Sequence, residues 1–479
     1  MRRVVLSGLL ALMGGAGGAA CTNAPRHGRS VVFASGADLQ SVNPLVTVHP
    51  FARQIERYVL LTTLARYDSS LTPRPYLASS WEWSADRRRL ALHLYSGLRW
   101  HDGVHTTARD VAWTINTARD PRTGYPRQGE LAAITRLDVS DDSTVVIAFA
   151  DSQTRFPDVF TDLAIAPAHL LDTVPPERMR RAAWNQAPVG NGPFRFVLHE
   201  PNRRWVFAPN LEFPRALGGP PALDRFVVVV VDEPQTKLAA LVDGELDIAG
   251  IQPADAKFAA RDASLRVLEY PMLLPYVIVF NARRTPFNDL AVRRAISESI
   301  DRQQIVAGYL YGFGRPASGP TVPGERGVSH PHAVPVRLDA ARRLLAGRRI
   351  TFELLTVGSG EAPLEQMLQS QLARVGCDVR IRQLELTAFL DRVYGTHEFD
   401  AAVLGVQGDL GQEYVRTITR LAGMETGTVP QALQVARDSE PAAFLYYARG
   451  LQAASRRVAG IRMDVRGELP TITEWRVAQ

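Results

Sequence analysis

Hydrophobic positions along this chain alternate between short β-branched runs and stretches with helical periodicity. Residues 226–231 read FVVVVV, a continuous apolar run that fits a strand buried on both faces. Residues 234–243 then place their apolar side chains on one side of a helix, which Gly244 ends. A further apolar segment starts at Ile248. Strand, helix and strand in succession predict a βαβ unit, and therefore a parallel sheet.

The same alternation returns in the second half of the chain and predicts a second α/β sheet. Small-molecule sites favour domain interfaces and the carboxyl ends of parallel strands, so we expect two α/β lobes with a binding cleft between them. The expected elements are strands at 350–356, 379–383 and 399–405 and helices at 289–299, 339–345 and 364–375.

The N-terminus has the pattern of a secretory signal. Two arginines precede an apolar run at 4–13, which is far shorter than the roughly 20 residues of a membrane-spanning helix. The small residues that follow end at Ala20, directly before Cys21. This arrangement resembles bacterial lipoprotein signals, in which the cysteine is diacylated and becomes the mature N-terminus, although Gly18 stands where leucine is usual. We therefore expect a signal peptide at 1–20 and lipidation at Cys21, with an ordinary secretory signal as the alternative.

Composition limits the other possibilities. Removal of 20 residues from 479 leaves a chain too long for one core, so two or three domains are expected. Besides Cys21 there is only Cys377, so an acylated protein would hold no disulfide. The formal net charge of +6 is scattered and no basic run is interleaved with aromatic residues, which argues against nucleic acid as a partner.

Five motifs follow one another between residues 41 and 113, and three more occur downstream. As an ordered set they resemble the family 5 extracellular solute-binding proteins, the peptide and nickel receptors of ABC importers. The resemblance covers most of the chain. The motifs are SVNPL (41–45), LARYD (64–68), LTPRPYLASSW (71–81), LRWHDG (98–103), ARDVAW (108–113), GNGPFRF (190–196), GELDI (244–248) and the segment 279–306.

The resemblance implies the fold of a two-lobed periplasmic binding protein, type II-like, with the extra inserted domain of the peptide-binding class. The first domain would combine 21–46, 185–270 and 450–479. The inserted domain would span 47–184, and the opposing lobe 271–449.

The resemblance also implies the binding residues. In peptide-binding members, the loop that here reads GVQGD (405–409) carries an aspartate that pairs with the α-ammonium group of the ligand. Asp409 stands at that position, although Val406 and Leu410 replace the usual neighbours, and a capped surface aspartate remains the alternative. The implied set of ligand-binding residues is Thr47, Val48, His49, Tyr125, Gly250, Ile251, Gln252, Gly405, Gln407 and Asp409.

Two other motifs could suggest chemistry but favour structural roles. His101 beside Asp102 has no nucleophile near it in sequence, and Asp102-Gly103 is typical of a turn between a strand at 90–94 and a helix capped near Thr107. The glycines of VGNGPF lack the remaining residues of a P-loop or a dinucleotide fingerprint. We expect a tight turn that enters a strand at 194–197.

The implied function is capture of a solute by closure of two lobes, followed by docking on an ABC permease, by a monomer at the periplasm or cell surface with no cofactor, no metal and no catalytic step. An exported hydrolase and an envelope chaperone or adhesin are the alternatives, although G-x-S-x-G, H-E-x-x-H and S-x-x-K motifs are absent. The family resemblance leaves the ligand open among peptides, nickel complexes, haem, opines and oligosaccharides.

Overall fold

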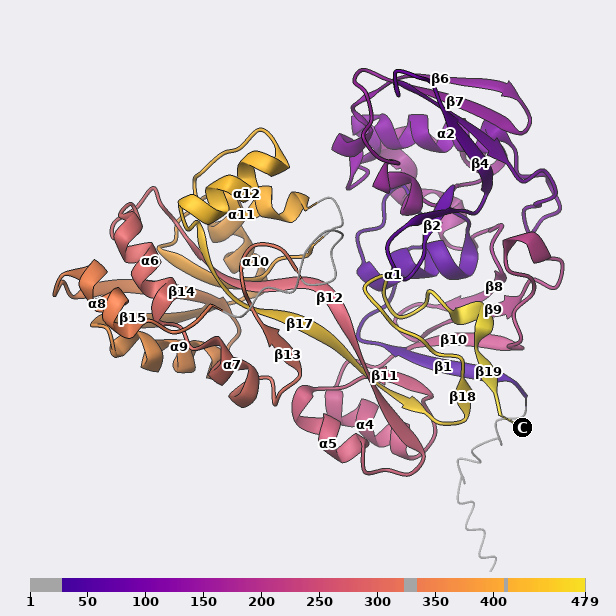
Figure 1. The fold of residues 1–479 in the computed structure, drawn as a ribbon. Coiled ribbons are helices and arrows are strands. Elements are labelled where there is room, and N and C mark those ends of the chain that lie inside the picture. Colours follow the sequence, from indigo (N-terminus) through magenta and orange to yellow (C-terminus); the bar gives the residue numbers. More distant parts are fainter. Residues whose placement is uncertain (1–27, 323–333, 409–411, 479) are drawn as a thin grey trace, which may run out of the picture.

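A computed structural model describes residues 28–322, 334–408 and 412–478. Most of its strands join one large sheet that runs through both halves of the molecule (Figure 1). In spatial order, the strands of this sheet are β15 (Cys377–Leu384), β14 (Ile350–Val357), β16 (Ala401–Gly405), β12 (Leu265–Phe280), β17 (Ala442–Ser455), β11 (Ile248–Gly250), β1 (Ser30–Ser35), β10 (Arg225–Val230), β9 (Arg204–Pro209) and β8 (Phe194–Glu200), with β13 (Gly314–Pro316) paired to β17.

Within this sheet, two long antiparallel strands join two parallel triads, and β9 and β8 extend the first triad as antiparallel strands. In one triad, β10 and β11 both pair in parallel with β1, and in the other, β15 and β16 both pair in parallel with β14. Between the triads, β12 and β17 pair with each other, and each also pairs antiparallel with the nearest strand of one triad. These two strands are therefore shared by both halves.

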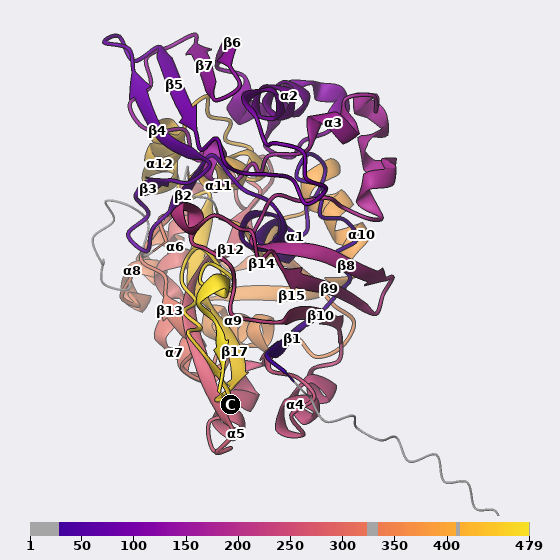
Figure 2. The same ribbon diagram turned by 90° about the vertical axis from the view of Figure 1, so that its right-hand side faces the viewer.

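A separate four-stranded antiparallel sheet packs above the first triad, and helices cover the large sheet (Figures 1 and 2). The small sheet contains β4 (Ala78–Trp83), β5 (Arg89–Leu94), β7 (Thr144–Phe149) and β6 (Ile134–Asp141). Among the described residues, the α-helices of at least five residues are α1 (Pro50–Ile55), α2 (Ala108–Arg119), α4 (Pro234–Val242), α6 (Leu290–Ser299), α7 (Arg302–Gly308), α8 (Leu338–Leu345), α9 (Pro363–Ala373), α10 (Leu386–Leu390), α11 (Glu413–Leu421) and α12 (Val429–Asp438), with the π-helical turns η1 (Glu56–Leu60) and η9 (Asp391–Gly395).

The period of two along a strand explains how the second half of the chain forms its core. On β12, Ile278 and Phe280 pack with residues of α6 to α9, whereas Val277 and Val279 pack with residues of α10 to α12 on the other face. Helices thus cover both faces of the sheet here, which is why β16 and the end of β12 read as continuous apolar runs, whereas the edge strand β15 alternates apolar and polar residues.

The structure confirms the predicted βαβ unit and corrects two details. β10, α4 and β11 follow in order, with the N-terminal β1 inserted between the two parallel strands. The expected second sheet is not separate, because β12 and β17 continue the hydrogen-bond ladder from one triad to the other. The run FVVVVV is also not buried on both faces: Phe226 and Val228 are buried, whereas Val229 and Val230 are only partly buried.

Asp247 of the GELDI motif holds the first triad to the segment that follows β17. Its fully buried carboxylate accepts the backbone N–H of Val32 at 2.8 Å and two bonds from the guanidinium of Arg457, at 2.5 and 2.7 Å. Arg457 also donates to the Ser30 carbonyl at 2.8 Å. The Asp247 carboxylate therefore accepts hydrogen bonds from residues in the N-terminal and C-terminal parts of the chain.

Asp247→Ala should lower the free energy of unfolding by about 3 kcal/mol, because it leaves a buried N–H without an acceptor and a guanidinium without its anion. Chemical denaturation monitored by circular dichroism measures this loss. Asp224→Ala is the matched control, since Asp224 pairs with Arg29 beside the same strands but both side chains are about half exposed. Equal losses in the two variants would contradict the role assigned to Asp247.

Candidate functional site

The register of the large sheet brings the carboxyl ends of the two triads toward each other. At the end of β11, Gly250 lies opposite Gln452, and Ile251 continues along β17 by donating to the Leu451 carbonyl at 3.1 Å. At the end of β16, Gly405 lies opposite Tyr276, and the following residues continue along β12 toward lower residue numbers. The last strand of each triad therefore ends beside the same central stretch of β12 and β17. The carboxyl edges of the two triads face one another across this stretch.

A cavity of about 390 Å³ lies at the carboxyl edge of the second triad. Its wall is formed by the ends of β14, β15 and β16, the first turn of α9, the helix α10 with η9, and Tyr276 of β12. Gly405 belongs to this wall, and its Cα lies close to Tyr276: an added Cβ would come within 3.1 Å of that ring. The expected binding loop therefore starts in the wall of this cavity.

The base of this cavity combines a buried carboxylate with tyrosines. Glu365 is 7% exposed and accepts a hydrogen bond from the Thr356 hydroxyl at 2.7 Å. Tyr276 stacks on the buried Tyr446 with ring centroids 4.7 Å apart. Burial raises the pKa of Tyr276 and of its neighbour Tyr309, and the nearby charge of Glu365 adds to both shifts. These tyrosines are therefore neutral hydroxyl groups at physiological pH.

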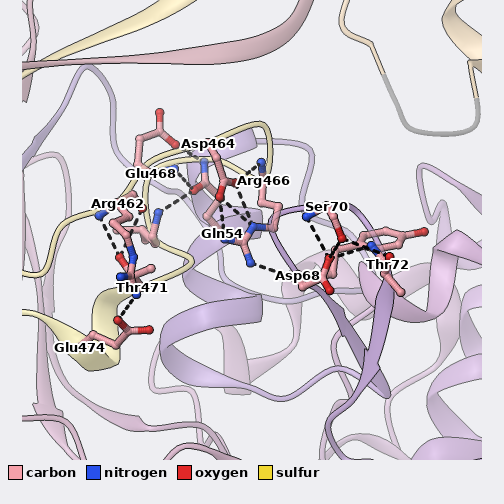
Figure 3. Close-up of polar contacts among 12 residues, drawn as sticks. Gln54, Asp68, Ser70, Thr72, Arg462, Asp464, Arg466, Glu468, Thr471 and Glu474 are labelled. Atoms are coloured by element: carbon pink, nitrogen blue, oxygen red, sulfur yellow. Dashed lines mark hydrogen bonds and ion pairs between the residues drawn. The ribbon is translucent and has the colours of Figure 1, made fainter. Parts of the chain in front are cut away.

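The central stretch of β12 and β17 holds close contacts between the two strands and the C-terminal segment. The ring of Tyr270 lies on Gly450, where an added Cβ would come within 2.0 Å of it. The Tyr270 hydroxyl donates to Glu468 at 2.7 Å. Glu468 is in turn held by Gln54 of α1, whose side-chain oxygen accepts the Glu468 N–H at 2.7 Å (Figure 3). The end of the chain thus connects α1 to the shared strands.

The segment Thr47, Val48 and His49 directly precedes α1. His49 is the N-cap of this helix, and its Nδ1 accepts the Ala52 N–H at 3.2 Å. Val48 is 65% exposed, whereas Thr47 is buried. Of these three expected binding residues, only Val48 presents most of its side chain to solvent.

A cluster of charged side chains follows at α1 and η1. Asp162 is buried and pairs with three guanidinium groups, those of Arg53, Arg57 and Arg127, the last two at 2.5 and 2.8 Å. Burial and the two neighbouring arginines lower the pKa of Arg53 to about 10. A concentration of positive charge therefore lies beside the buried segment that leads into α1.

Tyr125 and Thr47 both lie at the edge of this cluster, next to Glu56. Burial raises the pKa of Tyr125 to about 12, and its hydroxyl has no hydrogen-bond partner among the described residues. Burial also raises the pKa of Glu56 from its ordinary 4.5 to about 8, while a hydrogen bond from Thr47 and the charge of Arg53 act in the opposite direction. Thr47 and Tyr125, which are far apart in sequence, therefore both lie near Glu56.

The remaining expected binding residues are at the edges described above. Gly250 and Ile251 are partly buried, and Gln252 and Gln407 are exposed. Gln407 lies beside the Leu273 carbonyl of β12 at 3.5 Å. Asp409 and Cys21 lie outside the described residues.

The two motifs with a possible chemical role pack against each other. The His101 N–H donates to the Gly190 carbonyl at 2.7 Å, and its ring Nε2 lies 3.0 Å from the Gly192 carbonyl. Asp102 pairs with His169 instead of His101. An added Cβ on Gly190 would come within 2.0 Å of the Leu60 carbonyl, which requires glycine there. These contacts confirm the structural interpretation, in which the VGNGPF turn enters β8.

Sequence reasoning missed the pocket residues Glu365, Tyr276 and Tyr309. In the sequence, only their positions in the predicted elements could have indicated a site. Glu365 lies in the first turn of a helix that follows a parallel strand, and Tyr276 stands among apolar residues of another strand. Their convergence depends on the pairing of β12 with β16, which no local pattern indicates. Among the described residues, no group of three or more metal-ligating side chains occurs.

This architecture, with two α/β lobes sharing two long strands and facing each other by their carboxyl edges, defines a two-lobed solute receptor. The model of the bacterial extracellular solute-binding proteins, family 5 Middle, matches residues 72–422. The chain belongs to this family of solute-binding proteins. No helix within the described ranges is long and apolar enough to cross a membrane.

Individual relatives agree with this assignment. The chain is 26% identical over 407 residues to a probable di/tripeptide-binding protein of Pseudomonas aeruginosa, covering 78% of this chain and 75% of that protein. It is 22% identical over 510 residues to the oligopeptide-binding protein AppA of Bacillus subtilis, covering 95% and 93%. The solved structure of AppA with a nonapeptide superposes with a TM-score of 0.76 at 21% identity, covering 94% of this chain and 99% of AppA. The Listeria monocytogenes substrate-binding protein CtaP gives 0.80 at 18% identity, with 94% and 100% covered.

Glu56→Gln should make the protein more stable at pH 8 relative to wild type than at pH 5. With a folded pKa of about 8 and an unfolded value of 4.5, native Glu56 retains its proton where the unfolded chain has lost it. Stability therefore falls as pH rises through this interval. Denaturant unfolding of both proteins at several pH values measures the difference. Glu82→Gln, at an exposed position of β4, should follow wild type. A difference that stays constant with pH would show that native Glu56 is ionised throughout.

Proposed function

We propose that this protein captures a peptide, or a similar small solute with a free amino group, between its two lobes and delivers it to the permease of an ABC importer. The observation that carries the proposal is the face-to-face arrangement of the two carboxyl edges above β12 and β17. Membership in the family and the similarity to peptide-binding relatives support it. No chemical step is required of any residue.

Closure takes place by bending of the shared strand pair. The register of β12 against β17 shifts between Pro271 and Pro275, and a second shift follows after Tyr276. Prolines supply no N–H to the ladder, so hydrogen bonding is weakest in this stretch. A solute that contacts both edges gains contacts only in the closed form and therefore shifts the population toward it.

The domain assignment follows from the same strands. We propose one lobe from residues 28–270 and 450–478, carrying the inserted domain at 47–184, and an opposing lobe from 271–449. Both boundaries between the lobes then fall inside β12 and β17. Permease docking would use the outer faces of the two lobes, whose relative position changes on closure.

Titration calorimetry with di-, tri- and pentapeptides, amino acids, sugars and a nickel–histidine complex tests the proposal. Saturable binding of peptides with Kd in the micromolar range or below, with unchanged peptide recovered afterwards, supports a receptor. Cleaved peptide would favour an exported hydrolase. Binding of none of these probes would overturn the proposed function.

Asp409→Asn should weaken peptide binding by about a hundredfold or more, because an ammonium group buried on closure would lose its anion at a cost of about 3–5 kcal/mol. N-acetylation of the peptide should weaken wild-type binding to a similar extent, and it should add little in the variant, since both changes remove one contact. Calorimetry of the four combinations measures this coupling. Additive losses would show that Asp409 and the amino group act independently.

Cys21→Ser should release the protein from the membrane fraction of its host while peptide affinity stays unchanged, because a diacylated cysteine supplies the two chains needed for stable attachment. Fractionation followed by immunoblotting measures the distribution. Cys377→Ser is the control, since that thiol is buried in the opposing lobe. A variant at Cys21 that stays membrane-bound would exclude lipidation there as the anchor.

A further inference from the structure

The pocket at the carboxyl edge of β14, β15 and β16 is lined by acidic side chains without basic side chains beside them among its described residues. Glu361 and Glu365 are part of its wall, and the described wall residues include no lysine, arginine or histidine. Within the described part of the chain, no basic side chain forms an ion pair with Glu365. A carboxylate that is 7% exposed and has the Thr356 hydroxyl as its partner is stabilised further by a cation.

Nearby groups hold the Glu365 side chain in position. The residue lies in the first turn of α9, where the helix dipole stabilises negative charge. The Thr356 hydroxyl donates to one carboxylate oxygen, which fixes the orientation of the group. The pocket therefore presents a positioned carboxyl group at its base.

The walls suit a cation attached to an aliphatic stem. Tyr276 lines the cavity with its ring, and Tyr309 lies beside it, so a positive group near Glu365 also meets aromatic rings. At the mouth, four large apolar side chains are exposed to solvent: Val357 at 46%, Leu386 at 53%, Leu390 at 44% and Tyr394 at 40%. An exposed apolar rim above a buried charge matches the amphipathic side chains of lysine and arginine.

We propose that this pocket binds a positively charged side chain of the captured solute, of the lysine or arginine type, with Glu365 as the partner of the charge. This deepens the proposed function and rests on it, because it assigns a side-chain specificity to the same cleft. The chain as a whole carries a formal charge of +6, so a preference for cationic ligands would have to come from a local site. Gly405 connects this pocket to the loop that precedes Asp409.

The test uses tripeptides in matched pairs, in which lysine is exchanged for norleucine, and arginine for citrulline, at each of the three positions in an alanine background. Calorimetry should show that wild type binds the cationic member at least tenfold more tightly at one position. In Glu365→Gln, which keeps the acceptor for Thr356, this preference should fall to threefold or less.

Asp378→Asn is the matched control. It removes one carboxylate from an exposed site at the start of β15, five residues before Gln383 of the pocket, and therefore about 17 Å away along the strand. This variant should keep the full preference for lysine. If it loses the preference as Glu365→Gln does, the effect comes from net charge and the assignment of the pocket is wrong.

The outcomes distinguish failure of the cationic subsite from failure of the proposed function. Wild type that binds neutral and cationic peptides equally at all three positions would overturn the cationic subsite and leave peptide capture intact, and this arm needs no variant. A preference that survives in Glu365→Gln would also overturn it. Binding of none of the probes in the panel above, peptides included, would instead refute the proposed function.

Discussion

The antiparallel pairing of β12 with β17 is the constraint on which the remaining structure depends. Each triad has its own helices and its own hydrophobic clusters, and within the described ranges the only ladder that joins them consists of these two strands. Their direction makes the two triads run opposite to each other, so that the carboxyl edges meet above the shared stretch. A solute site between the lobes is a consequence of this pairing.

The contacts along the shared stretch combine close packing with a change of register. Tyr270 lies on Gly450 and is bonded to Glu468, which ties the C-terminal segment to the first lobe through Gln54. Only a few residues further on, Pro271 and Pro275 bound a shift in the ladder. The first group of contacts fixes the strands where they enter the first lobe, and the second permits bending toward the other lobe.

The surroundings of α1 and of the pocket at β14, β15 and β16 differ in electrostatic character. Around α1, three guanidinium groups surround Asp162, and Glu56 is buried beside them. At the opposing edge, Glu365 lies at the base of a pocket with tyrosines and an apolar rim. A receptor for extended solutes gains orientation from such an asymmetry, because the two ends of a dipolar ligand meet different surroundings.

The sequence by itself determined the local elements and the family. The β-branched run at 226–231 specified β10, and the helical patterns specified α4, α6 and α9, since burial of one face imposes a period on the chain. Asp289 caps α6 by accepting the Ala291 N–H at 2.8 Å, and Thr107 caps α2, as their residue types predict. The ordered motifs were sufficient to identify the family. They correspond to turns and to close contacts such as that between Gly190 and Leu60.

Only the tertiary structure decided which residues share a site. Thr47 and Tyr125 both lie near Glu56, and Gly405 contacts Tyr276 in the wall that also holds Glu365, through pairings between segments far apart in the chain. The sequence also contained no indication that the sheet continues through β12 and β17. The pattern of apolar residues along a strand predicts which face is buried, but it does not predict which strands pair with it. Local sequence fixes periodicity and capping through short-range contacts, whereas the pocket arises from long-range strand register.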